Sequence, residues 1–143
     1  MFDAVIIARY IVDRCTRNNS LITNLKLQKL LYYVWIDYYN ATGSYLFNNF
    51  ICAWPLGPVV VDAYDEFCVY GGLTIRKRFD NLDIGEYEKS LINESLNKLM
   101  QYSASELVNK THAVGKPWDL VFSNGAGRGR IISFDLIIEK ECS

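Results

Sequence analysis

The stretch from residue 25 to residue 70 constrains the fold of this 143-residue chain more than any other. Its first part, about residues 24–41, predicts a helix, because apolar side chains recur there every three or four residues. Thr23 suits the N-cap of this helix, and Gly43 suits its C-terminal end. The apolar stripe consists of Leu27, Leu30, Leu31, Val34 and Tyr38. We therefore expect the rest of the chain to cover this helix.

The same helix is unusually aromatic, and two interpretations of that remain open. The aromatic side chains are Tyr32, Tyr33, Trp35, Tyr38 and Tyr39. In the favoured interpretation they belong to the core and its rim. In the other, Tyr33, Trp35 or Tyr39 stays exposed and anchors a protein partner, because aromatic residues are enriched at the centres of protein interfaces.

The second part of this stretch combines a short apolar segment with a sharp corner. Residues 46–54 predict either a strand or an extended link, and residues 73–78 are the candidate pairing partner of such a strand. Gly57 and Pro58 then form the corner. Because proline is favoured as the first residue of a helix, we expect a helix over residues 58–70.

The remaining elements are predicted from amphipathic periodicity and capping residues. A mostly α-helical, compact single domain over residues 1–143 follows, with five to six helices and room for one short β-hairpin. The signals are a helix over 2–17, a helix capped by Asp83 and ending near 102, a Ser103–Glu106 capping box before a helix ending near 112, a short helix over 118–122, and a last helix capped by Ser133.

The composition limits the classes of partner. Half of the residues are hydrophobic and the net charge is −1, which suits a folded core and argues against nucleic-acid or membrane binding. Arg76, Lys77 and Arg78 form the one dense basic run. This run is either a solvated loop or a docking patch for an acidic partner or a phosphate.

The chemistry-bearing residues do not form a recognisable catalytic or metal-binding pattern. The four cysteines are scattered, so neither a metal nor another cofactor is expected. The glycine-rich loop at 123–130 lacks the lysine and hydroxyl of a phosphate-binding loop. His112, the single histidine, is the only candidate general base, and the favoured interpretation is a structural residue in the core or packed on Trp118. We expect a non-enzymatic protein.

The cellular compartment is predicted from the lack of targeting signals. The N-terminal residues read as the start of a charged amphipathic helix rather than as a signal peptide. No apolar run reaches the roughly 18 residues of a membrane span. We therefore expect a cytoplasmic protein with reduced thiols.

Four pieces of the chain together resemble one family, the SocA-like antitoxin or Panacea domain. They are the run Leu25–Tyr32; Ala53-Trp54 followed by Gly57-Pro58-Val59-Val60; Tyr64 with Phe67 and Gly71; and His112 followed by Pro117-Trp118. Each motif alone is weakly specific, whereas their order over about residues 4–140 is fairly specific. The residues between Trp54 and Gly57 depart from the family's usual pattern, which leaves the packing of that corner open.

The resemblance implies a mostly helical antitoxin that neutralises a cognate toxin protein by direct contact. Most matching positions are then scaffold, with Gln28 expected to bond the backbone of the 54–58 segment and Lys29 left open between that role and partner contact. The scaffold positions are Leu27, Gln28, Lys29, Leu30, Tyr32, Trp54, Gly57, Pro58, Tyr64, His112 and Trp118.

The motif does not locate the toxin-binding surface, which is expected among exposed side chains. The candidates are Tyr33, Trp35, Tyr39, Arg76, Lys77 and Arg78. The alternative function is a proteolytic adaptor or a prophage or host interaction protein, which would also bind a protease or a host factor. A DNA-binding regulator is disfavoured, because none of the expected helices is rich in the residues of a recognition helix.

Overall fold

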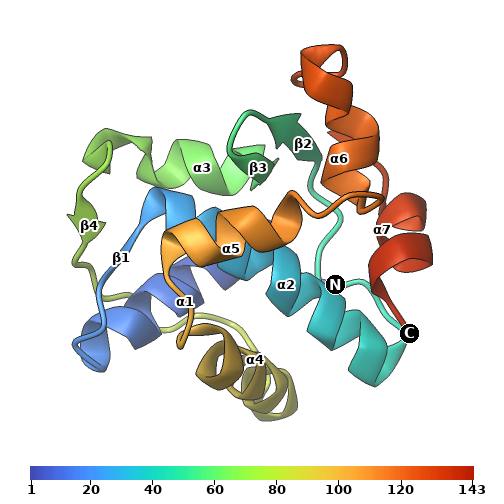
Figure 1. Ribbon diagram of the computed structural model, residues 1–143. Coiled ribbons are helices and arrows are strands. Elements are labelled where there is room, and N and C mark those ends of the chain that lie inside the picture. The colour runs from blue at the N-terminus through green and yellow to red at the C-terminus, as the bar shows by residue number, and fades with distance from the viewer.

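Helix α2 (Asn24–Thr42) lies at the centre of the structure, a computed structural model that describes residues 1–143 (Figure 1). All ten residues from Leu27 to Ile36 are buried, so other elements cover this helix on every side. The Thr23 hydroxyl oxygen accepts a hydrogen bond from the Lys26 N–H, and Gly43 ends the helix in the left-handed conformation. The predicted helix and both of its caps are confirmed.

Seven α-helices and five short strands make up the chain, which is mostly α-helical as predicted but has more elements than expected. The other helices are α1 (Ala4–Arg17), α3 (Val61–Phe67), α4 (Glu86–Leu99), α5 (Ala104–Thr111), α6 (Pro117–Phe122) and α7 (Phe134–Glu141). The strands are β1 (Ile22–Thr23), β2 (Ile51–Trp54), β3 (Gly57–Val60), β4 (Thr74–Ile75) and β5 (Ile131–Ile132).

The corner at Gly57 and Pro58 is part of a hairpin, and the predicted helix over 58–70 is wrong in its first turn. Strand β3 pairs antiparallel with β2, with Pro58 opposite Ala53, and β5 pairs with the other edge of β2. Proline is tolerated in β3 because this is an edge strand, where a missing N–H breaks no ladder. Helix α3 begins only at Val61, and a 3₁₀ turn over Cys68–Tyr70 follows it.

The pairing of residues 46–54 with 73–78, one of the alternatives for this segment, is also wrong. Strand β4 pairs instead with β1, in the register Ile22 with Ile75 and Thr23 with Thr74. This second, two-stranded sheet ties the segment after α3 to the start of α2 (Figure 1). Two small antiparallel sheets therefore replace the single hairpin that was expected.

Of the predicted caps, those at Ser103 and Ser133 are confirmed and the one at Asp83 is wrong. The Ser103 hydroxyl oxygen accepts from the Glu106 N–H, and the Glu106 carboxylate accepts from the Ser103 N–H. Ser133 caps α7 in the same way through the Leu136 N–H. Helix α4 begins at Glu86 after Gly85, with no side-chain cap.

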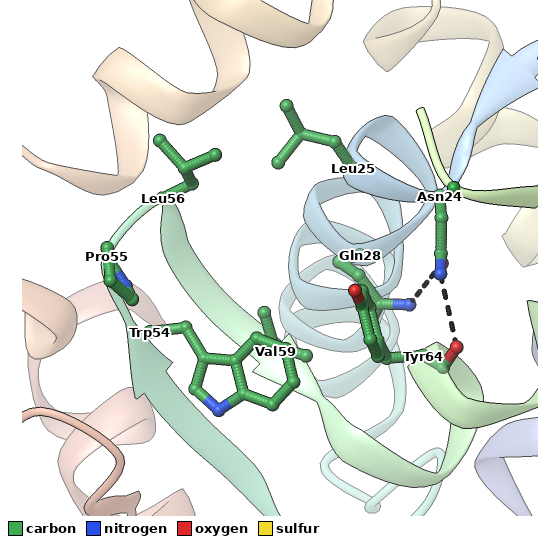
Figure 2. Close-up of a pocket in the computed structure, with 9 residues that line it drawn as sticks. Asn24, Leu25, Gln28, Trp54, Pro55, Leu56, Val59 and Tyr64 are labelled. Carbon is green, nitrogen blue, oxygen red and sulfur yellow. Dashed lines mark hydrogen bonds between the residues drawn. The ribbon is translucent and has the colours of Figure 1, made fainter. Parts of the chain in front are cut away.

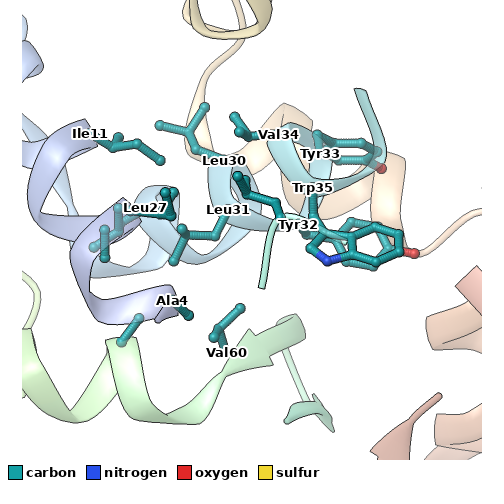
Figure 3. Close-up of a cluster of buried hydrophobic side chains, with 14 of the residues drawn as sticks. Ala4, Ile11, Leu27, Leu30, Leu31, Tyr32, Tyr33, Val34, Trp35 and Val60 are labelled. Carbon is teal, nitrogen blue, oxygen red and sulfur yellow. The ribbon is translucent and has the colours of Figure 1, made fainter. Parts of the chain in front are cut away.

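One hydrophobic core of 31 buried residues surrounds α2, and Figure 3 shows its centre. Ala4 and Ile11 of α1 face Leu27 and Leu31 of α2, and Val60 of β3 closes the cluster from below (Figure 3). Helix α2 also packs against α3, α4, α5 and α7. None of the seven helices combines the length and apolar character of a membrane span.

Candidate protein-binding groove

The polar side chain of Gln28, inside the apolar run of α2, binds the outer edge of strand β3. Its carbonyl Oε1 accepts a hydrogen bond from the Val60 N–H at 3.0 Å, and its Nε2 donates to Asn24 Oδ1 at 2.9 Å. Asn24 Nδ2 in turn donates to the Tyr64 carbonyl at 3.1 Å. Gln28 and Asn24 are buried, so the chain of bonds satisfies groups that water cannot reach. The structural role predicted for Gln28 is confirmed, although its backbone partner is Val60 and not a residue of the predicted 54–58 segment.

Lys29 acts on the same strand edge. Its side chain is 0% exposed, and Nζ donates to the Pro58 carbonyl at 2.9 Å. Burial lowers the pKa of Lys29 to about 7. The alternative left open for Lys29 is therefore decided in favour of bonding the 54–58 backbone. Together, Gln28 and Lys29 occupy the N–H and C=O groups by which an edge strand would recruit a further strand.

Gly57 is required where this edge meets Lys29. Its φ is +113°, which side chains rarely adopt, and a Cβ there would lie 2.7 Å from Thr111 Oγ1 and 2.9 Å from Lys29 Cε. Lys29 and the hydroxyl-bearing Thr111 are both buried. The family motifs at 28–29 and 57–58 thus fit each other sterically.

A groove with a volume of about 290 Å³ opens beside this strand edge (Figure 2). Val59 lies in it between Trp54 and Gln28, while Leu25 and Leu56 stand at its upper side in Figure 2. The full lining is Asn24, Leu25, Gln28, Trp54, Pro55, Leu56, Val59, Tyr64 and Gly71. Sequence reasoning missed Leu25, Pro55, Leu56 and Val59 as site residues. The one sequence signal for an exposed apolar site was Leu56, which lies between Pro55 and Gly57 in a turn.

The walls of the groove are apolar and partly exposed. Leu56 is 55% exposed, and the rings of Trp54 and Tyr64 meet edge to face with their centroids 4.8 Å apart. The amide groups of Asn24 and Gln28 are bound within the protein. The groove therefore offers apolar contact area, which suits an apolar side chain of a partner protein.

The Trp118 side chain holds the hairpin from the other side. Its indole Nε1 donates to the Trp54 carbonyl at 2.7 Å, and the His112 ring stacks on it with centroids 3.8 Å apart and planes 6° apart. The predicted packing of His112 on Trp118 is confirmed. Burial, with a smaller effect from Lys29, lowers the pKa of His112, so the stacked ring is neutral at neutral pH.

The aromatic residues proposed as partner anchors are mostly inside the protein. Trp35 is 0% exposed and its Nε1 donates to the Phe47 carbonyl at 2.9 Å, while Tyr33 is 6% exposed beneath the Lys110 ammonium group. The favoured interpretation, that these side chains belong to the core, is confirmed for Trp35 and Tyr33, and the alternative of exposed anchors is wrong for both of them. Tyr39 is half-buried and stacks on Trp35 with centroids 5.5 Å apart.

The basic run forms part of a hollow that we call the basic pocket. Its volume is about 600 Å³, and its six lining residues are Thr16, Arg17, Asn19, Arg76, Lys77 and Arg78. Arg76, Lys77 and Arg78 are all exposed, as the docking interpretation requires. The Lys77 N–H donates to the Thr16 hydroxyl at 3.1 Å, which fixes the run against the end of α1. The sequence did not indicate that Arg17 joins the run.

The motif-bearing part of the chain matches a known family. Residues 27–119 match the family described as antitoxin SocA-like, Panacea domain. The chain is also similar to the protein named Antitoxin SocA of Caulobacter vibrioides (strain NA1000 / CB15N), with 33% identity over 137 residues that cover 87% of this chain and 72% of the relative. No solved structure matches the chain. The matched region includes Gln28, Lys29 and the β2–β3 hairpin.

Proposed function

This chain belongs to the SocA-like, Panacea domain family of antitoxins, and we propose that it neutralises a cognate toxin by binding it directly, without catalysing a reaction. The observation that supports direct binding is the partly exposed apolar groove of Trp54, Leu56 and Tyr64. Apolar surface of this kind is in contact with water in the free chain. Its burial against a partner would stabilise the complex. We propose that a side chain of the toxin fills the groove.

A non-enzymatic role agrees with how the motif residues are used. Gln28 and Lys29 bind the β3 backbone, and His112 stacks on Trp118. These are polar residues of the motifs, and their contacts hold the wall of the groove in place. We infer that the motifs preserve a shaped surface, and that the exposed residues around it select the toxin.

The first test uses the product of the neighbouring gene as the candidate toxin. That gene is expressed from an inducible promoter with and without this protein, and surviving cells are counted. We expect the protein to restore growth and to co-purify with the toxin. A toxin that still kills, with no co-purification, contradicts the proposal. The amount of toxin in the cells separates inhibition from the adaptor alternative, because an adaptor for a protease removes its client.

The groove itself is tested by Leu56→Asp, which places a charge in the apolar wall. Leu56 is 55% exposed in the β2–β3 turn, so the fold tolerates the change, while the desolvation of a carboxylate opposes docking. We expect the affinity for the toxin, measured by isothermal titration calorimetry, to fall roughly a hundredfold, and neutralisation to be lost with it. Leu120→Asp is the matched control, because Leu120 is 48% exposed on α6 and lines no part of the groove. Equal affinities for the two variants would remove the groove from the interface.

A further inference from the structure

The groove and the basic pocket lie at the two ends of one short exposed segment. Gly71 lines the groove, and Arg76 lines the basic pocket. Five residue steps separate them, so the two sites are at most about 18 Å apart along the chain. Leu73, between them, is 74% exposed, while Ile75 is buried in β4 and fixes the segment to β1. A partner surface of ordinary size is therefore wide enough to reach both sites.

The basic pocket carries positive charge that the protein does not neutralise. Arg76, Lys77 and Arg78 form no ion pair, whereas Arg17 pairs with Asp13 and Asp80. The Lys77 ammonium group rests over the Phe79 ring, 5.1 Å from its centroid, which keeps it at the surface of the pocket. The chain as a whole has a net charge of −1, so this cluster is a local concentration of positive charge.

We propose that the two sites together recognise one segment of the toxin, in which an apolar side chain enters the groove and neighbouring acidic residues bind Arg76, Lys77 and Arg78. This proposal rests on the antitoxin function proposed above. Charge complementarity selects an acidic segment for the pocket. A nucleic acid is disfavoured, because it needs a row of phosphate contacts along a basic surface, while here an apolar groove adjoins three unpaired cations.

We expect the two sites to affect different rate constants of toxin binding, so kinetic measurements can distinguish their contributions. Opposite charges at an exposed rim accelerate association and make it depend on salt. An apolar side chain seated in a groove slows dissociation instead. Binding kinetics of the intact protein with the neighbouring gene's product, at low and high salt, therefore report on the pocket and the groove separately.

The test variant is the double substitution Arg76→Glu, Arg78→Glu, and its control is Arg128→Glu, Arg130→Glu. Both pairs are exposed, lack ion pairs and change the net charge equally. We expect the first variant to associate roughly tenfold or more slowly at low salt, and to lose most of the salt dependence. The control should associate like the unaltered protein, and Leu56→Asp should mainly accelerate dissociation. Circular dichroism spectra verify that each variant is folded.

Two results would overturn the proposal without touching the antitoxin function. One is an Arg76→Glu, Arg78→Glu protein that associates at the unaltered rate while the unaltered protein still neutralises the toxin. The other is an Arg76→Glu, Arg78→Glu protein that binds the toxin like the unaltered protein but has lost a measurable affinity for duplex DNA from the upstream region. That result would assign the pocket to nucleic acid. An unaltered protein that neither binds nor neutralises the toxin would overturn both proposals together.

Discussion

At the scale of single residues, the polar positions inside the motif of α2 act on a strand far away in the sequence. Gln28 and Lys29 are neighbours in the helix, yet they bind Val60 and Pro58 on the same edge of β3. The family resemblance implied that Gln28 bonds the backbone of this corner, and its burial explains why its amide needs such a partner. It did not indicate the burial of Lys29, since a lysine side chain is ordinarily solvated.

Replacing Gly57 by alanine is expected to reduce the free energy of unfolding by at least about 2 kcal/mol. The methyl group would have to fit at a φ of +113° and within 3 Å of buried Lys29 and Thr111 atoms. The measurement is urea denaturation followed by circular dichroism. Gly72→Ala is the control, because a Cβ there meets no atom within 4 Å. Equal stability of the two variants would mean that the corner is not tightly closed.

The buried amine of Lys29 is expected to make stability depend on pH. Burial keeps its pKa at about 7 in the folded protein, against the ordinary lysine value of 10.5 in the unfolded chain. Between these values the folded state binds fewer protons than the unfolded state, so the free energy of unfolding rises with pH, by up to about 1.4 kcal/mol per unit. Below about pH 7 both states are protonated and the slope vanishes.

Lys29→Met removes this titration while retaining an unbranched side chain of similar length. We expect the difference in unfolding free energy, unaltered protein minus variant, to rise between about pH 7 and pH 9. Subtraction removes contributions from other groups, and the lowered pKa of His112 places its titration below this window. Parallel pH profiles would show that Lys29 keeps its proton when buried.

At the scale of elements, the sequence predicted local structure well and non-local pairing poorly. Helix α2 and the Ser103 cap were predicted correctly, because their signals lie within a few neighbouring residues. Pro58 carried an equally local signal for a helix start, but strand pairing with Ala53 overrides it. In the β1–β4 pair, Ile22 and Ile75 are 53 residues apart in the sequence, a separation at which short apolar segments carry no register information.

The same limit applies to the candidate site. Gln28, Trp54 and Tyr64, which line the groove, were predicted only as scaffold positions of the family motif, and the groove itself was not predicted. Leu25 and Leu56 complete it only after α2 and the hairpin turn are placed side by side (Figure 2). The aromatic anchors failed for a related reason, since periodicity does not reveal that every face of α2 is covered.

The two predicted N-caps at Ser103 and Asp83 provide a direct comparison of a real cap with an apparent one. Ser103→Ala removes the hydroxyl that accepts from the Glu106 N–H, and we expect a loss of about 1 kcal/mol in the free energy of unfolding. Asp83→Ala should change it by less than about 0.5 kcal/mol, because Asp83 is exposed and lies outside α4. Chemical denaturation of both variants decides the matter, and equal losses would place the start of α4 at Asp83.

At the scale of the whole molecule, a single core around one central helix predicts cooperative unfolding. The three tryptophans sample different regions: Trp35 in the core, Trp54 in the hairpin and Trp118 in α6. Because their surroundings all depend on α2, we expect tryptophan fluorescence and far-ultraviolet circular dichroism to give coincident urea transitions. An earlier fluorescence transition would show that the hairpin and α6 detach before the core melts.

The groove described above also has a use in protein engineering. The side chains that hold strand β3 are those of Gln28 and Lys29, whereas Leu25, Leu56 and the ring of Tyr64 line the opening without bonding that edge. A combinatorial library that varies these three positions leaves the hydrogen bonds of the frame intact. Selection from such a library by display methods would search for new binding specificities on a constant backbone, much as antibody loops are diversified on a fixed framework.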